Sequence, residues 1–200
     1  MQKGRSHVSR RLFLGACVGL GLSGCASSGP AVLYGIDAGR VDTTANSRKR
    51  AQVLVPRPRA LKALDTENIA VVEKGLAYSY FPQSAWADSL PNVVQAKLVQ
   101  TLQNTNRLRG VGLPGDGLLI DYQLQTDLRS FELRVEGPAR GVVEIAAKLV
   151  NDRNGRTVDN RVFRAEIPSG GTSVDQAVTA LNGAADKVFQ DIAQWVLSRV

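Results

Sequence analysis

Two long stretches in the second half of the chain alternate between apolar and polar residues, and this pattern constrains the fold more than any other feature. Mostly apolar side chains occupy every second position from Leu118 to Leu128 and again from Val143 to Leu149. Because successive side chains of a strand point to opposite faces of a sheet, each stretch predicts a strand with one buried face. Asn154-Gly155 is typical of a tight turn, and 157–167 returns as a partner strand. Long antiparallel hairpins are therefore expected at the centre of the fold.

Two other segments repeat apolar residues at helical spacing. The first begins at Leu90, with Asp88 or Ser89 available as N-cap, and is expected to end near Asn104. The second follows Gly170-Gly171, and Ser173 with Gln176 three positions later matches a capping box. Its apolar stripe runs to the C-terminus, so a long helix is expected to close the domain.

Four short runs in the first half are expected to be further strands, namely 31–37, 52–55, 69–73 and 76–81. The glycine-rich segment 110–117 is expected to be a loop. The order of strands, helix, strands and helix predicts the α+β class: a two-layer sandwich whose mixed or mostly antiparallel sheet carries both helices on one face. One domain is expected over residues 31–200.

The first 24 residues have the three-part layout of an export signal. Residues 1–11 are polar and basic, 12–22 are apolar, and small residues precede Cys25. The apolar run is about half the ~20 residues that a membrane-spanning helix needs. The four residues of the segment resemble a bacterial lipobox: Leu22, Ser23, Gly24 and Cys25. The resemblance implies that Cys25 is acylated and becomes the first residue, whereas the structural alternative is a buried or disulfide-bonded cysteine.

The mature chain would be held close to its membrane. Residues 25–30 form a short lipidated tether, and the five residues after Cys25 reach at most about 18 Å when extended. Ala26 rather than Asp follows the cysteine, which by resemblance to the sorting rules of enteric bacteria favours the periplasmic face of the outer membrane. Arg10 and Arg11 also resemble a twin-arginine export signal, although paired arginines equally supply an ordinary basic leader.

The charge of the chain does not predict a nucleic-acid partner. The formal net charge is +7, but four of the 25 Lys and Arg residues precede Cys25, so 21 remain against 18 Asp and Glu. A net charge of +3 of mixed sign is a weak electrostatic footprint for nucleic acid. The basic run 48–50 is read as a solvated loop or, alternatively, as a contact for anionic lipid headgroups.

No motif in the sequence predicts an enzyme or a bound cofactor. His7, the one histidine, lies in the export signal, and no paired-cysteine metal spacing occurs. The glycines of 110–115 have the letters of a dinucleotide fingerprint, but they follow a predicted helix and lead into a strand, the reverse of what that motif requires. The strand carboxylates are expected to form a solvated face rather than an acid pair; they are Asp121, Asp127, Glu132, Glu136 and Glu144.

Aromatic residues gather immediately before the first predicted helix. Tyr78, Tyr80, Phe81 and Trp86 fall within nine residues. They predict a core plug beneath that helix, and the alternative is an exposed patch for a partner contact by Tyr78, Tyr80 and Trp86.

These features together resemble the auxiliary lipoprotein family of ABC-type transport systems, the PqiC-like proteins. The segments that carry the resemblance are the lipobox, Val32-Leu33-Tyr34, 69–72, 86–90, the long hairpins and the closing helix. The basic segment 38–50 and the glycine-rich segment 110–117 depart from the family pattern.

The resemblance implies a non-catalytic subunit of a mammalian-cell-entry transport system for lipids or other hydrophobic molecules. The subunit would dock the transport conduit at the outer membrane and support envelope integrity. Its partners would be the membrane, through acyl chains on Cys25, and the mammalian-cell-entry substrate-binding subunit, with self-association into a homo-oligomer also compatible. No cofactor is expected besides the acyl chains. The alternative is a lipoprotein that binds a hydrophobic ligand in its own cavity.

Overall fold

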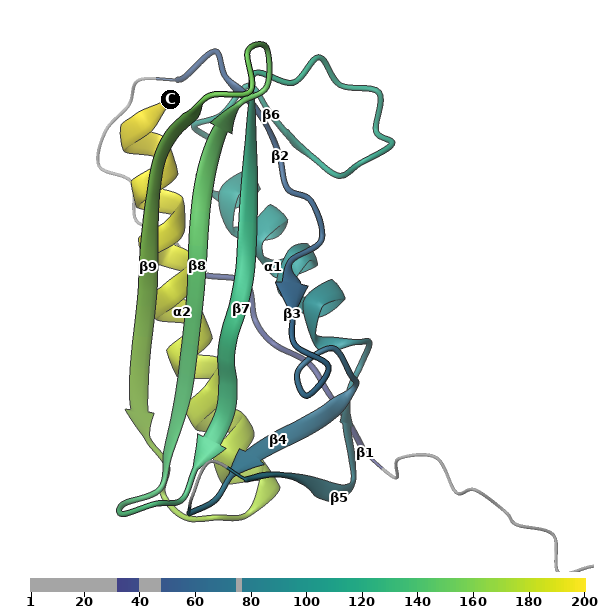
Figure 1. The fold of residues 1–200 in the computed structure, drawn as a ribbon, viewed down its shortest axis with the longest axis vertical. Helices are drawn as coiled ribbons and strands as arrows, with labels where there is room; N and C mark the ends of the chain where they lie inside the picture. Colours follow the sequence, from purple (N-terminus) through teal and green to yellow (C-terminus); the bar gives the residue numbers. More distant parts are fainter. Residues whose placement is uncertain (1–31, 40–47, 75–76) are drawn as a thin grey trace, which may run out of the picture.

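The computed structural model describes residues 32–39, 48–74 and 77–200. Within them the protein forms a nine-stranded mixed sheet with two helices on one face. Figure 1 shows both helices behind the sheet, along the length of its longest strands. The opposite face of the sheet carries no helix among the described elements. This arrangement is the α+β two-layer fold that the sequence predicts.

The centre of the sheet is an antiparallel meander of three long strands. β7 (Tyr122–Arg134) pairs with β8 (Arg140–Asn151), which pairs in turn with β9 (Thr157–Pro168). A bulge in β7 between Leu128 and Ser130 shifts the register by one residue. Because side chains alternate along a strand, this bulge changes which residues of β7 face the helices beyond that point.

The other side of β7 is shared by three short strands that pair with it one after another, all in parallel. They are β2 (Gln52–Leu54), β3 (Arg59–Ala60) and β4 (Asn68–Val72).

Three more strands extend the sheet on this side. β5 (Tyr78–Trp86) is antiparallel to β4, and β1 (Val32–Tyr34) is parallel to β5. β6 (Gly110–Gly112) is parallel to β2. β1 and β6 are therefore edge strands on the same side of β7, toward its two ends.

The two helices begin differently. α2 (Val174–Arg199) begins with the predicted capping box, in which the Ser173 hydroxyl accepts from the Gln176 backbone N–H and the Gln176 side chain accepts from the Ser173 N–H. α1 (Leu90–Asn104) has Ser89 at its N-cap, but that side chain makes no capping hydrogen bond. Both helices have the bounds that the apolar spacing predicts.

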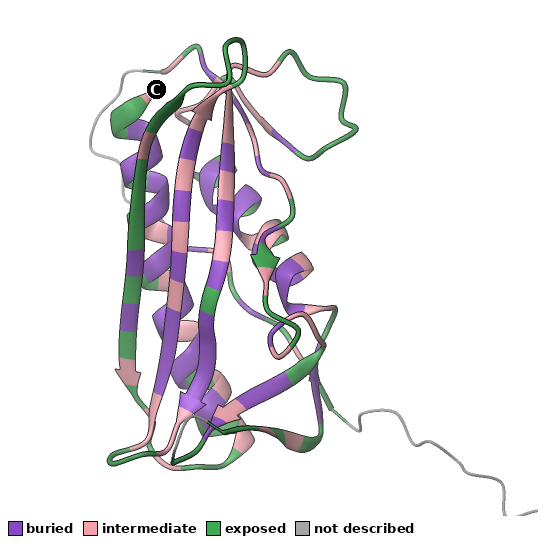
Figure 2. Ribbon diagram, viewed as in Figure 1, coloured by how far each residue is buried: buried purple, intermediate pink, exposed green. Residues whose placement is uncertain are grey.

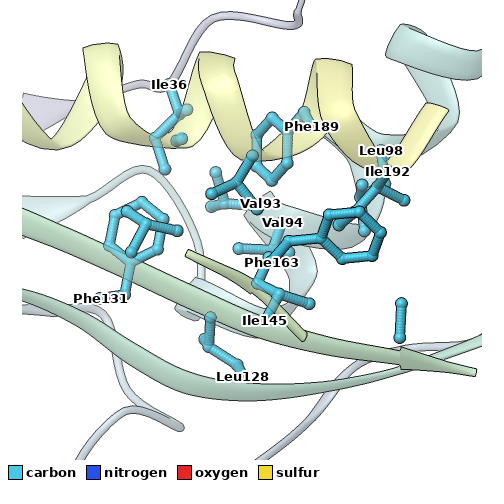
Figure 3. Packing of buried hydrophobic residues seen from close by; sticks show 14 of the residues in the cluster. Ile36, Val93, Val94, Leu98, Leu128, Phe131, Ile145, Phe163, Phe189 and Ile192 are labelled. Atoms are coloured by element: carbon cyan, nitrogen blue, oxygen red, sulfur yellow. The ribbon is translucent and has the colours of Figure 1, made fainter. Parts of the chain in front are cut away.

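One hydrophobic core lies between the helices and the sheet. Figure 3 shows Phe189 and Ile192 of α2 directed toward Phe131 and Ile145 of the sheet. Burial alternates with the residue number from Val143 to Leu149 of β8 and from Phe163 to Glu166 of β9, whereas residues 130–133 of β7 are all buried (Figure 2). Gly141 lets α2 approach β8 closely, because a Cβ there would lie 2.7 Å from backbone atoms of Ala180 and Leu181.

Two local predictions are wrong. The strand expected from Leu118 begins at Tyr122, and Leu118 is exposed rather than buried. Residues 110–112, expected in a loop, form β6, because their backbone groups pair with β2. In each case the deciding partner is a segment more than 25 residues away in the sequence, beyond the reach of local patterns.

Candidate functional site

The predicted export signal and lipidation site lie outside the described residues. Arg10, Arg11 and the lipobox 22–25 all precede Val32, where the description of the N-terminal part begins. β1 therefore follows Cys25 by seven positions and lies at an edge of the sheet. Acylation of Cys25 remains a prediction.

The aromatic residues before α1 separate into a buried part and an exposed part. Trp86 is 1% exposed and packs edge-on against Phe131, with 5.6 Å between ring centroids. It belongs to the core and presents no surface to a partner. Tyr78 and Tyr80 are 40% and 39% exposed. Of the three aromatic residues considered for partner contact, these two tyrosines are accessible.

The pairing register places both tyrosines on the helix-free face. Tyr80 and Glu132 are the two neighbours of Ala70, one on each side, and Tyr78 and Arg134 are the two neighbours of Val72. Directly paired residues project from the same face of a sheet. We call Tyr78, Tyr80, Ser130, Glu132 and Arg134 the tyrosine–glutamate cluster. The Tyr80 hydroxyl donates to the backbone carbonyl of Ala63 at 3.2 Å, which fixes its orientation.

Glu132 is fully buried in this cluster, although the alternation of β7 predicts a solvated carboxylate. Its Oε2 accepts the Phe131 backbone N–H at 2.6 Å, and its Oε1 accepts Nη2 and Nε of Arg134 at 2.9 and 3.0 Å. A buried charge is tolerated only when it is paired and hydrogen-bonded, and here it is both. Burial raises the pKa of the Tyr78 phenol, and the negative charge of Glu132 raises it further.

The remainder of the helix-free face carries a network of ion pairs. Arg164 donates to Glu144 at 2.7 Å and also to Glu166, and Arg140 donates to Glu166 at 2.9 Å. Arg164 in turn holds the pKa of Glu166 below its ordinary value, and Glu144 followed by Glu166 raises the pKa of Arg164. Positive and negative side chains are thus interspersed on this face, so it offers directional polar contacts rather than a field of one sign.

A basic cluster forms at the end of the sheet where β2 and β6 begin. Lys49 N–H donates to the Arg107 carbonyl at 2.7 Å, and Arg109 N–H donates to the Ala51 carbonyl at 3.0 Å. These bonds bring the run 48–50 against a second basic segment that is more than 50 positions away. The members of this basic cluster are Arg48, Lys49, Arg50, Arg107 and Arg109. The sequence analysis singled out only the run 48–50. Arg107 and Arg109 do not form a basic run of their own, so no local pattern indicated that they belong to the same cluster.

A surface hollow of about 530 Å³ lies beside the basic cluster. Its lining includes Arg50, Arg109, Arg153 and Asp121. The Gln52 backbone N–H, followed by Arg153, lowers the pKa of Asp121. The hollow combines cationic and anionic groups, so its lining is polar, unlike that of a site for an apolar ligand.

Two other surface hollows also have polar linings. One of about 530 Å³ is lined by Asp37, Asn182 and Asp186 among others, and one of about 200 Å³ lies on the helix-free face beside Arg59 and Lys148. Polar and charged side chains dominate both linings, whereas pockets for apolar ligands are mostly hydrophobic and aromatic.

The described residues, 32–39, 48–74 and 77–200, hold neither a candidate metal site nor a helix able to span a membrane. Within these ranges no group of three or more His, Cys, Asp or Glu residues is placed to hold a metal ion. In the same part of the chain, neither helix is long and apolar enough to span a membrane.

Comparison with known proteins relates the domain to transport lipoproteins. The sequence profile described as "ABC-type transport auxiliary lipoprotein component" matches residues 34–193. The chain is 27% identical over 150 residues to the uncharacterized protein bll6063 of Bradyrhizobium diazoefficiens. That alignment covers 75% of this chain, and the chain spans only 40% of the length of that relative.

Solved structures show the same fold. The crystal structure of protein XCC0632 from Xanthomonas campestris is similar with a TM-score of 0.79 and 23% identity, covering 84% of this chain and 96% of that one. The hypothetical protein CT253 from Chlamydia trachomatis is similar with a TM-score of 0.56 and 8% identity, covering 76% and 98%. At such low identities the likeness concerns the fold alone.

Proposed function

Since this chain belongs to the family of ABC-type transport auxiliary lipoprotein components, we propose that it is a lipid-anchored, non-catalytic docking subunit of such a transport system. Cys25 carries the acyl chains, and the domain sits at the periplasmic face of the outer membrane. There it fixes the end of a conduit formed by a mammalian-cell-entry substrate-binding subunit. In this role it supports the movement of lipids or other hydrophobic molecules and the integrity of the envelope.

The observation that carries this proposal is the family match, because it extends over residues 34–193 and so includes almost the whole described fold. Two features of the molecule support a docking role. The long strands and both helices share one core, which makes a rigid platform. The helix-free face presents ordered arginine–carboxylate pairs and two half-exposed tyrosines, the residue types that contribute most to protein interfaces.

The rival role, a carrier that encloses a hydrophobic ligand, receives no support from the three hollows described above. Each of them has charged residues in its lining. A carrier would need a mostly apolar cavity able to bury most of a lipid chain. Docking is therefore the function that the geometry supports better.

Anchoring is tested by Cys25→Ala, with Cys17→Ala as the matched control, because Cys17 lies in the leader that would be removed. The protein with native Cys25 and the Cys17→Ala form should carry acyl chains by mass spectrometry and fractionate with the outer membrane. Cys25→Ala should lose both properties and weaken resistance of the envelope to detergent. Normal fractionation of Cys25→Ala at the outer membrane would contradict the anchor.

Docking is tested separately by affinity purification of the tagged, acylated protein from detergent-solubilised envelopes. The mammalian-cell-entry subunit should be recovered with it. A Tyr78→Ser/Tyr80→Ser double variant, which alters only half-exposed side chains, should recover less of that subunit while still fractionating with the membrane. Equal recovery would remove the tyrosines from the contact surface, and no recovery by the unaltered protein would contradict this partner.

A further inference from the structure

We propose that the edge of the sheet formed by β1 and by the segment following β6 lies on the lipid surface, so that the domain rests along the membrane instead of standing upright on its tether. The proposal rests on the anchoring of Cys25 proposed above. It assigns the membrane-facing side of the domain, which the family match does not address.

The exposed apolar residues of this edge come from two separate places in the sequence. In β1, Val32 and Leu33 are 47% and 61% exposed. After β6, Leu113, Leu118 and Leu119 are 37%, 39% and 86% exposed. We call these five residues the apolar edge. β1 and β6 are both terminal strands on the same side of β7, but β6 lies toward the beginning of β7 and β1 toward its end, so the apolar edge consists of two separate groups. Figure 1 shows the loop after β6 at the upper right of the molecule and β1 at the lower right.

The leucines after β6 are held in place by hydrogen bonds. The Asp116 carboxylate accepts the Leu113 N–H at 2.7 Å, and the Gln52 side chain donates to the Leu119 carbonyl at 2.6 Å. Gly115 and Gly117 adopt positive φ values of 99° and 69°. Glycine adopts this backbone conformation without steric cost, so the chain can turn sharply at these two positions. An ordered loop that presents leucines to solvent is a feature expected of a surface that meets an apolar environment.

Charge favours a lipid surface as the occupant. The basic cluster, residues 48–50 with Arg107 and Arg109, lies where β2 and β6 begin, and β6 leads into this loop. Acidic groups nearby include Asp116, which is engaged with Leu113, and Asp121, which pairs with Arg153 at 2.8 Å. Asp152 lies next to Asp121 and accepts from Gln123 at 2.6 Å, and within the basic cluster Lys49 donates to the Val200 carbonyl at 2.8 Å. Apolar side chains flanked by cations match the boundary between acyl chains and anionic headgroups.

The position of the anchor also favours lipid over a second protein. Cys25 precedes Val32 by seven positions, a span of at most about 25 Å when extended. Because β1 is itself part of the apolar edge, an acylated Cys25 brings this edge, rather than the β9 edge, within reach of the membrane. The acyl chains on Cys25 and the apolar edge belong to one chain. Once the acyl chains have inserted, the apolar edge is held at a high effective concentration next to the membrane, so even a weak contact by this edge is favoured.

The test uses acylated protein purified from membranes and reconstituted into phosphatidylcholine–phosphatidylglycerol vesicles, with or without brominated acyl chains. Leu119→Trp introduces a fluorescent reporter at the apolar edge, and Val158→Trp introduces one at a 41%-exposed site on β9 as the matched control. The native Trp86 and Trp195 are 1% and 4% exposed and provide a constant background. Brominated lipid should quench the Leu119→Trp signal about twofold and leave the Val158→Trp signal unchanged.

A second pair of variants tests the role of charge. Arg50→Glu/Arg109→Glu in the Leu119→Trp background should abolish most of the quenching, and Arg161→Glu on β9 should not. Equal quenching of Leu119→Trp and Val158→Trp, or none of either on anchored protein, would overturn the proposal.

Acylation of Cys25 and membrane contact by the apolar edge are measured separately. If mass spectrometry found Cys25 unmodified, its thiol would be coupled to a maleimide-bearing lipid in the same vesicles and the quenching comparison repeated. Quenching restricted to Leu119→Trp would then support the membrane-facing edge although the proposed acylation had failed. Absence of quenching would reject the edge whatever the state of Cys25.

Discussion

At the scale of single residues, the helix-free face depends on one buried carboxylate. Glu132 accepts three hydrogen bonds, two of them from Arg134. The Arg134 side chain is 27% exposed to solvent. The Glu132–Arg134 pair lies across β4 from the two half-exposed tyrosines. A charge in such a place stabilises the fold only while its partner is present, since desolvation opposes it at all times.

Glu132→Ala is expected to lower the free energy of unfolding by about 3 kcal/mol, because Arg134 would remain partly buried without its counter-charge. Glu132→Gln keeps the shape but replaces one carboxylate oxygen by an NH₂ group that cannot accept a hydrogen bond, and it is expected to cost about 1–3 kcal/mol. Urea denaturation followed by circular dichroism measures both. Glu136→Ala, at an exposed site in the following turn, is the control and should stay within about 0.5 kcal/mol of the parent. Equal stability of Glu132→Ala and Glu136→Ala would contradict a structural role for the buried pair.

Asp159 joins the end of α2 to β9 through two side chains of the helix. Its Oδ2 accepts from Arg199 Nε at 2.7 Å and from Trp195 Nε1 at 3.0 Å. These bonds, with a third from the Asn160 backbone N–H, hold the pKa of Asp159 below its ordinary value of 3.8. A carboxyl group with a lowered folded-state pKa stabilises the fold at pH values above its unfolded pKa, and this stabilisation is lost as the pH falls through the folded pKa.

Asp159→Asn should therefore be less stable than the parent at pH 7, and the difference should shrink as the pH falls below about 4. Urea midpoints of parent and variant between pH 7 and pH 2.5 give this difference directly. Asp191→Asn, on the exposed side of the same helix, should show little difference at any pH. A gap between parent and Asp159→Asn that widened toward acid pH would contradict the assigned direction.

At the scale of elements, the separation of α2 from β8 is set by Gly141. Both atoms that an added Cβ would meet at 2.7 Å belong to the helix backbone, so no side-chain rotation can relieve the contact. The helix would have to move as a unit. Close packing of this kind tolerates small changes poorly.

Gly141→Ala is expected to destabilise the protein by about 1–3 kcal/mol through overpacking. Gly35→Ala is the matched control, since an added Cβ there meets nothing within 4 Å, and it should be neutral or slightly stabilising. Thermal or urea unfolding of the two variants distinguishes them. Similar stabilities for the two would show that α2 can shift freely over the sheet.

At the scale of the whole molecule, both helices and every part of the sheet that faces them contribute to one core. Trp86 lies on the β5 side of that core and Trp195 on the β9 side, and both are buried among residues of the same cluster. A single core implies a single cooperative unit, which is the physical basis for a rigid platform.

Trp86→Phe and Trp195→Phe each leave one tryptophan to report on one side. Trp86→Phe removes an indole N–H that has no hydrogen-bond partner among the described residues, so it should be well tolerated. Fluorescence of the remaining tryptophan and far-UV circular dichroism should give the same urea midpoint within each variant. Two distinct midpoints would divide the domain into separately unfolding parts.

The amino-acid sequence by itself determined the elements whose stability is local or repetitive. α1, α2 with its capping box, and the long hairpins could be predicted because helical spacing and strand alternation each act between near neighbours. The tertiary structure alone decided which strands share β7, that Glu132 is buried, and that Leu118 is exposed. It also assembled the basic cluster and the apolar edge, each from two segments that lie 57 to 87 positions apart in the sequence. Burial and charge at these places depend on which distant segments pair, and pairing between distant segments leaves no periodic signal in the sequence.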